Sequence, residues 1–125
     1  MITNRPLHIN PFMVRMPIPA LVSISHRLSG VAIFLLIPLL LWILDQSLIS
    51  PENYETLNTY LQNWWLKPIV FIFILSLFFH LIAGIRHLLM DMHIGESLQG
   101  GRISSWIVFI LAFLASLFSA TWLWG

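Results

Sequence analysis

Cysteine is absent from this 125-residue chain, and charged residues make up only 9% of it. Without cysteine, the chain forms no disulfide, holds no iron–sulfur cluster and performs no thiol chemistry. Any metal must be held by histidine, methionine, aspartate or glutamate. The formal net charge of +1 also lacks the basic excess that a nucleic-acid partner requires, so we expect no such partner.

Apolar residues dominate instead: 58% of the chain is hydrophobic, and its mean hydropathy is +0.87. A water-soluble domain of this size needs far more polar surface. Three apolar segments, about 21–49, 64–92 and 103–124, are each long enough to cross a bilayer, which takes about 20 residues. The sequence therefore predicts an all-α integral membrane protein, one domain over residues 1–125, with three transmembrane helices and the lipid membrane as its surroundings.

The basic residues are unevenly distributed around these segments. Only Lys67 lies near the first connection, whereas the other five flank the opposite ends of the helices: Arg5, Arg15, Arg27, Arg86 and Arg102. Basic residues favour the cytoplasmic side, so we expect a cytoplasmic N-terminus and a periplasmic C-terminus. No cleavage site follows the first apolar run. A multi-pass protein of the bacterial inner membrane, without a signal peptide, is therefore expected.

This orientation gathers the ionisable residues of the helices at the cytoplasmic face. The second helix ends there with His80, Arg86, His87 and Asp91, and groups of this kind in lipid are costly unless they have a partner or a function. His80 and His87 share a helical face but stand ~10 Å apart along the axis. One iron, with Fe–N bonds of ~2 Å, cannot bind both.

If a haem is bound, His80 is the better ligand because it lies deeper in the membrane. Ala83 and Gly84 follow on nearly the same face and are small enough for a flat macrocycle to approach the backbone. The second axial ligand then comes from another helix: His26 of this chain, or a residue of a partner subunit, which we favour because three helices enclose a haem poorly.

Plainer interpretations of the same residues stay open. A hydrogen bond to a neighbouring backbone carbonyl is the less favoured explanation of His80, and close helix packing is an alternative explanation of Gly84. His87 suits a structural or propionate-contacting role better than ligation. Arg86 and Asp91 reach lipid headgroups or each other. Two further histidines are expected at the membrane interface with no special role: His8 and His93.

The first helix opens with a second polar group. Ser23 lies four residues before Arg27, so both side chains share a face. A hydroxyl and an always-charged guanidinium converging on one pocket suit the carbonyl oxygens of a quinone. A lipid phosphate is the alternative partner of the guanidinium.

At these residues the chain resembles the cytochrome b556 membrane-anchor family of succinate dehydrogenase, respiratory complex II. The resemblance rests on Arg5-Pro6 and on two motifs, Ser23-Ile24-Ser25-His26-Arg27-Leu28-Ser29-Gly30 and His80-x-x-x-Gly84-Ile85-Arg86-His87-x-x-x-Asp91. Three helices and the chain length extend it over the whole sequence. The segment that leads into the first helix is rich in proline, with Pro11, Pro17 and Pro19. This departs from the family's pattern but involves no predicted site residue.

The resemblance implies a haem b shared with a second anchor subunit, with His80 as this chain's axial ligand to the iron. It implies that Ser23 and Arg27 bind ubiquinone and that Asp91 serves its protonation. His26 and Arg27 match residues near the haem propionates; His87 has no assigned ligand role in the family, and we group it with them as a possible propionate contact.

The function implied is that of a membrane anchor of succinate:ubiquinone oxidoreductase, in electron transport and the tricarboxylic acid cycle. Electrons pass from a flavoprotein subunit through an iron–sulfur subunit to ubiquinone in the membrane. The isolated chain should have no dehydrogenase activity, because it contains no flavin motif and no cysteine. Two alternatives remain: an anchor of a quinol:fumarate reductase, and a small non-redox membrane protein whose histidines are structural.

Overall fold

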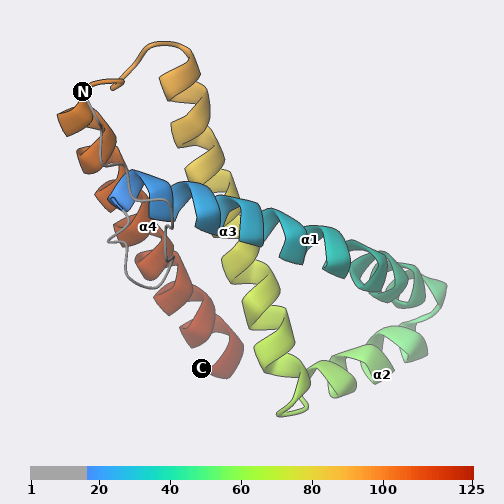
Figure 1. Ribbon diagram of the computed structural model, residues 1–125. Coiled ribbons are helices and arrows are strands. Elements are labelled where there is room, and N and C mark those ends of the chain that lie inside the picture. The colour runs from blue at the N-terminus through green and yellow to red at the C-terminus, as the bar shows by residue number, and fades with distance from the viewer. Residues whose placement is uncertain (1–16) are drawn as a thin grey trace, which may run out of the picture.

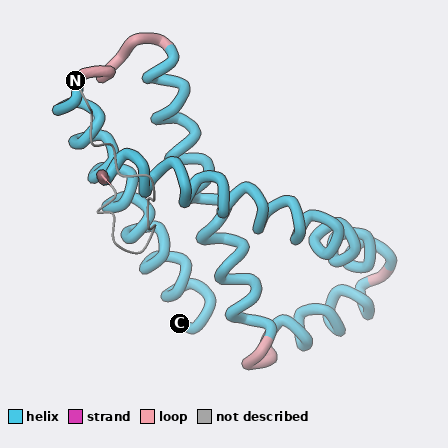
Figure 2. Tube along the Cα trace, viewed as in Figure 1, coloured by secondary structure: helices cyan, strands magenta, loops and turns pink. Residues whose placement is uncertain are grey.

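The structure, a computed structural model, describes residues 17–125. Its order along the chain is α1 (Ile18–Ile49), α2 (Pro51–Leu61), α3 (Leu66–Asp91) and α4 (Leu98–Trp124), as Figure 1 shows. Between residues 17 and 125 there is no strand, and only short connections interrupt the helices (Figure 2). The N-terminal residues used above, including Arg5 and His8, lie outside the described range.

α1, α3 and α4 are each long and apolar enough to cross a membrane. The all-α prediction with three spans is therefore confirmed. α1 begins at Ile18 rather than 21. Pro17 is its N-cap residue, and Pro19 lies in the first turn, where the backbone N–H has no partner. α4 begins at Leu98 rather than 103, since the Ser97 hydroxyl accepts a hydrogen bond from the N–H of Gly100.

α2 was not expected from the sequence, because its eleven residues have no long apolar run. Its first turn has the features of a helix start. The Ser50 hydroxyl accepts a hydrogen bond from the N–H of Asn53, Pro51 occupies the first turn, and Glu52 places a negative charge at the positive end of the helix. The first connection is therefore a short helix rather than a loop.

The three spanning helices meet through small side chains. α1 crosses α3, and α4 runs beside α3 (Figure 1). The buried apolar residues at these contacts are few: Val22, Phe79, Ala83, Val108 and Ala112. Lipid provides no hydrophobic drive for helices to associate, so small residues that let backbones approach are what holds such a bundle together. Most of the larger apolar side chains face outward, as expected in hydrocarbon.

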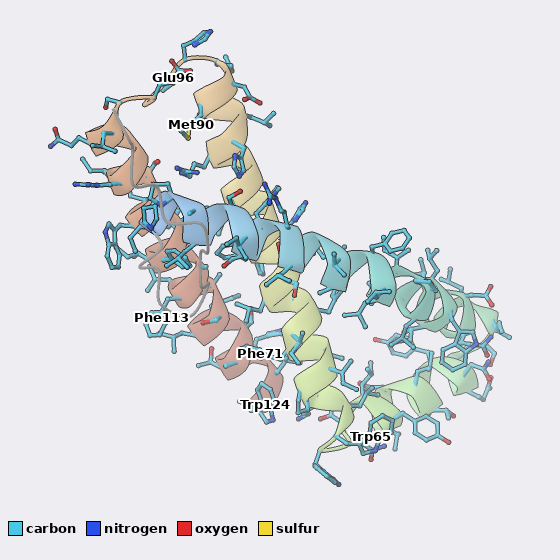
Figure 3. All side chains as sticks on the ribbon, in the orientation of Figure 1. Trp65, Phe71, Met90, Glu96, Phe113 and Trp124 are labelled. Carbon is cyan, nitrogen blue, oxygen red and sulfur yellow. The ribbon has the colours of Figure 1, made fainter. Side chains whose placement is uncertain are left out.

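The far half of α1 diverges from α3, and α2 spans the gap between them (Figure 1). These three helices enclose an apolar cavity of about 470 Å³, and we call this region the apolar corner. Its lining is Leu39, Trp42, Ile43, Leu57, Tyr60, Leu61, Trp65, Leu66 and Ile69. In Figure 3, Trp65, Phe71 and Trp124 lie toward this end of α3, whereas Met90 and Glu96 lie at the opposite end. The tryptophans at this end fit a membrane interface.

Candidate functional site

Three histidines from two helices meet where α1 crosses α3. The rings of His26 and His80 are stacked with their centroids 4.1 Å apart and an interplanar angle of 12°. The ring of His87 lies 5.1 Å from that of His26, tilted by 56°. The crossing thus brings together two sequence motifs separated by more than fifty residues, and we call this region the histidine crossing.

Hydrogen bonds from α1 orient the imidazole of His80. Its Nδ1 lies 3.2 Å from the carbonyl oxygen of His26 and 3.2 Å from the hydroxyl of Ser29. The Ser29 hydroxyl donates its one proton to that same carbonyl, over 2.7 Å. Both neighbours of Nδ1 are therefore acceptors, so Nδ1 carries a proton. In the neutral ring the lone pair then belongs to Nε2, which is the state that a metal-binding histidine needs.

Two glycines leave room for these rings. A Cβ at Gly30 would lie only 3.0 Å from Cε1 of His80, closer than nearly all real contacts. A Cβ at Gly84 would lie 3.5 Å from Nε2 of His26, which is ordinary van der Waals distance. Gly30 therefore leaves space that a larger side chain would take from the His80 ring. Gly84 faces a histidine ring rather than an open surface for a macrocycle.

His26 does not fit the role of second axial ligand. Two ligands of one iron approach from opposite sides, each with a nitrogen directed at the metal about 2 Å away. Stacked rings present their faces to each other instead. Over the described residues, no three histidine or carboxylate side chains are placed to hold one metal ion. Within residues 17–125, the stacked rings therefore do not place His26 opposite His80 as a second haem ligand.

Arg86 is buried, with 6% of its surface exposed, and points toward α4. Its Nε donates to the hydroxyl of Ser104 over 2.9 Å, and its Nη2 donates to the carbonyl of Gly101 over 3.4 Å. Both interpretations made from the sequence were wrong: Arg86 does not reach toward headgroups, and within residues 17–125 no ion pair joins it to Asp91. Arg86 instead links α3 to α4 through these two hydrogen bonds.

Of the three predicted quinone residues, only Ser23 and Arg27 are placed on one helix face. Ser23 is half-buried and shares its face of α1 with Arg27, which is exposed. Asp91 is exposed at the end of α3, and no hydrogen bond in the described range joins it to either residue. These side chains are accessible to a further subunit or to a ligand. His93, in the following connection, is exposed and pairs with Glu96 over 2.9 Å.

Sequence analysis missed the roles of Ser29 and Gly30. Both lie inside the motif that carried the resemblance, and Ser29 is one turn beyond His26 on α1. Their contacts with His80 depend on the angle at which two distant helices cross. Helical periodicity places them on the same face as His26, but it does not indicate which residue of another helix they touch.

The fold and this site define a class: a three-span membrane protein whose helix crossing presents a metal-competent histidine. The family model described as "Succinate dehydrogenase/Fumarate reductase transmembrane subunit" matches residues 1–119, and the chain belongs to that family.

Named relatives are similar over most of their length. The chain is 38% identical to the succinate dehydrogenase cytochrome b556 subunit of Coxiella burnetii, over 97% of this chain and 98% of that one. It is 31% identical to the subunit of the same name from Paracoccus denitrificans, over 82% and 78%. It is 29% identical to the mitochondrial cytochrome b560 subunit of Mus musculus, over 91% and 69%. Recognition of this family from the two motifs is therefore confirmed.

Proposed function

We propose that this chain is the haem b-containing membrane anchor of a succinate:ubiquinone oxidoreductase. The observation that carries the proposal is the state of His80, whose Nδ1 proton is engaged by two acceptors on α1 while Nε2 keeps its lone pair. The names of the relatives, which are cytochrome b subunits of succinate dehydrogenase, support the same function.

The residues present fit a haem in two respects. His80 would hold the iron through Nε2, because its Nδ1 is bonded to α1, and Gly30 leaves the space that the His80 ring occupies. A bound haem b supplies one-electron transfer in the membrane. His26, Arg27 and His87 would contact its propionates, with Arg27 contributing a permanent positive charge.

Quinone binding is assigned to the exposed end of the same crossing. The hydroxyl of Ser23 donates to one carbonyl oxygen of ubiquinone, and the guanidinium of Arg27 stabilises the negative charge that develops as electrons arrive. Asp91 delivers protons through water from the exposed end of α3. The pocket is completed by other subunits, because this chain leaves Arg27 and Asp91 uncovered.

The assembly that follows contains a flavoprotein subunit, an iron–sulfur subunit and a second membrane anchor. The iron–sulfur subunit docks at the face that carries Arg27 and Asp91, and the second anchor supplies the other haem ligand. In the bacterial inner membrane this face is the cytoplasmic one, as the basic residues predict.

The test is the absorption spectrum of the purified complex, reduced minus oxidised. We expect a b-type band in the wild type and its loss in His80→Ala, with the four subunits still assembled. His93→Ala is the matched control, because His93 is exposed in a connection and should leave the band unchanged. The absence of a band in the wild type, or an unchanged band in His80→Ala, would refute the haem assignment.

A fumarate-reducing anchor is the alternative that the family description also covers. Extraction and identification of the bound quinone separates the two functions. Ubiquinone agrees with succinate oxidation; menaquinone would favour fumarate reduction and overturn the direction proposed here.

A further inference from the structure

Within residues 17–125, Ser29 is the one buried hydroxyl bonded to a residue of the histidine crossing, with 7% of its surface exposed. It belongs neither to the haem ligands nor to the quinone residues. Its hydroxyl nevertheless bridges the two groups that determine the state of His80, since it donates to the carbonyl of His26 and accepts from Nδ1 of His80. We propose that Ser29 is a positioning residue that sets the orientation and electron donation of His80 toward the haem iron. This inference rests on the proposed function.

The first part of the argument is geometric. The two hydrogen-bond partners of His80 Nδ1 both lie on α1. They are the hydroxyl of Ser29 and the carbonyl oxygen of His26, within one turn of each other. The stacked His26 ring and the glycine at position 30 restrict the plane of the imidazole. Rotation of the ring about its Cβ–Cγ bond would break both hydrogen bonds. The ring plane, and with it the direction of the Nε2 lone pair, is therefore fixed by α1.

The second part is electronic. Acceptors on the distal N–H of a metal-bound imidazole increase its basicity and so stabilise the more oxidised metal. Here the hydroxyl that accepts from Nδ1 itself donates to a carbonyl, and hydrogen bonds in such a chain strengthen one another. Removal of the hydroxyl leaves Nδ1 with one acceptor instead of two. The iron should then be easier to reduce.

The experiment is a redox titration of the haem in the intact, purified complex, together with its low-spin electron paramagnetic resonance spectrum. In Ser29→Ala we expect a higher midpoint potential and a shifted resonance. The equilibrium between ferric and ferrous haem should change several-fold, up to about tenfold, which corresponds to about 59 mV for a one-electron couple.

Ser29→Thr should keep the midpoint potential and the resonance spectrum near their wild-type values. In a helix, a threonine hydroxyl bonds the carbonyl one turn earlier as serine does. The added methyl group has room, because Ser29 borders an open groove of about 440 Å³ between α1, α3 and α4. Should Ser29→Ala fail to assemble, Ser29→Cys has a similar volume and a weaker acceptor, so its potential should shift in the same direction.

Ser119→Ala is the matched control. Ser119 is also buried, at 3% exposed, and its hydroxyl also donates to a backbone carbonyl one turn earlier, that of Ala115 over 2.7 Å. It contacts no histidine, so its loss should leave the haem unchanged. An unchanged or lowered potential in Ser29→Ala, relative to Ser119→Ala, overturns the inference while the haem assignment stands. A wild-type complex without haem overturns the proposed function instead.

Discussion

The two ends of α3 differ in how the neighbouring helices pack against them. At the histidine crossing, helices approach through glycine, serine and alanine, and polar groups bond one another from α1 to α3 and from α3 to α4. At the apolar corner, α1 and α3 diverge, and α2 covers a cavity lined by leucine, isoleucine and aromatic side chains. Close approach makes specific hydrogen bonds possible in lipid, where no water is available to satisfy a polar group. Divergence leaves only nonspecific apolar contact.

The comparison teaches where specificity resides in this chain. The polar groups at the crossing have defined partners at defined distances, so a substitution there should alter a measurable property of the site. A change in the apolar corner should alter packing alone. The predictions below test that division, from the largest expected effect to the smallest.

Arg27→Ala should give the largest effect. In the proposed quinone site, removal of the guanidinium would take away the charge assigned to stabilising the reduced quinone, and the loss of one such group typically costs about 10²–10³-fold in rate. We therefore expect quinone reduction by the complex to fall by that factor, while succinate oxidation by an artificial dye is retained. Arg102→Ala, an exposed arginine of α4, is the control. Equal loss of both activities in Arg27→Ala would remove this residue from the quinone site.

Gly30→Ala should disturb His80 more than Gly84→Ala disturbs His26. The new Cβ at position 30 would lie 3.0 Å from the His80 ring, against 3.5 Å for the corresponding contact at position 84. Overpacking of this kind costs about 1–3 kcal/mol. The ratio of haem to protein in the purified complex should fall for Gly30→Ala and stay near the wild-type value for Gly84→Ala. Equal haem content in the two variants would show that the crossing is less closely constrained than its geometry indicates.

Arg86→Ala should weaken the contact between α3 and α4. It removes charge-assisted hydrogen bonds to Ser104 and Gly101 from a buried position, a loss of about 1–3 kcal/mol in the free energy of unfolding. Thermal unfolding of the detergent-solubilised complex measures this. Arg102→Ala should change the midpoint little, and a midpoint for Arg86→Ala no lower than that control would contradict the role of Arg86 as a fastening between the helices.

Ser50→Ala should have the smallest effect, confined to α2. Loss of an N-cap hydroxyl costs about 1 kcal/mol of helix stability, and faster amide hydrogen exchange in residues 51–61 should report it. Exchange in α3 is the internal control, since Ser50 makes no contact there that the substitution would remove.

Ser50, the N-cap residue of α2, also affects the pKa of the Glu52 carboxyl. Hydrogen bonds from its own backbone N–H and from the Ser50 hydroxyl hold the pKa of the Glu52 carboxyl below its usual value. A lowered pKa in the folded state means that this contribution is complete above the usual glutamate pKa and is lost as the pH falls through the folded value. α2 should therefore loosen in acid, and Ser50→Ala should move that transition to higher pH. A pH-independent exchange rate in α2 would contradict this.

Much of the fold follows from composition. Three apolar runs of membrane-spanning length leave few alternatives to a helical membrane protein, because a backbone in lipid must satisfy its hydrogen bonds internally. α2 was not predicted because this short helix contains no long apolar run. Its stability depends on the Ser50 cap and on packing against its neighbours.

The site was only partly predictable. The spacing of His80 and His87 predicts that one iron cannot bind both, since helical rise is a local property. The partner of Arg86 was not foreseen, because Ser104 and Gly101 lie on another helix and carry no charge that would indicate them. The spacing of residues in a sequence does not indicate an uncharged hydrogen-bond acceptor on a distant helix.

By itself, the sequence determined the class of protein, the number of spans and the family, and it predicts which histidine is best suited to bind iron. Local rules of hydropathy and helical periodicity carry those conclusions. The tertiary structure decided which nitrogen of His80 keeps its lone pair, that the ring of His26 stacks on that of His80, and that Ser29 and Gly30 lie against the His80 ring. These depend on the angle and distance at which α1 crosses α3, which small residues permit but no local pattern encodes.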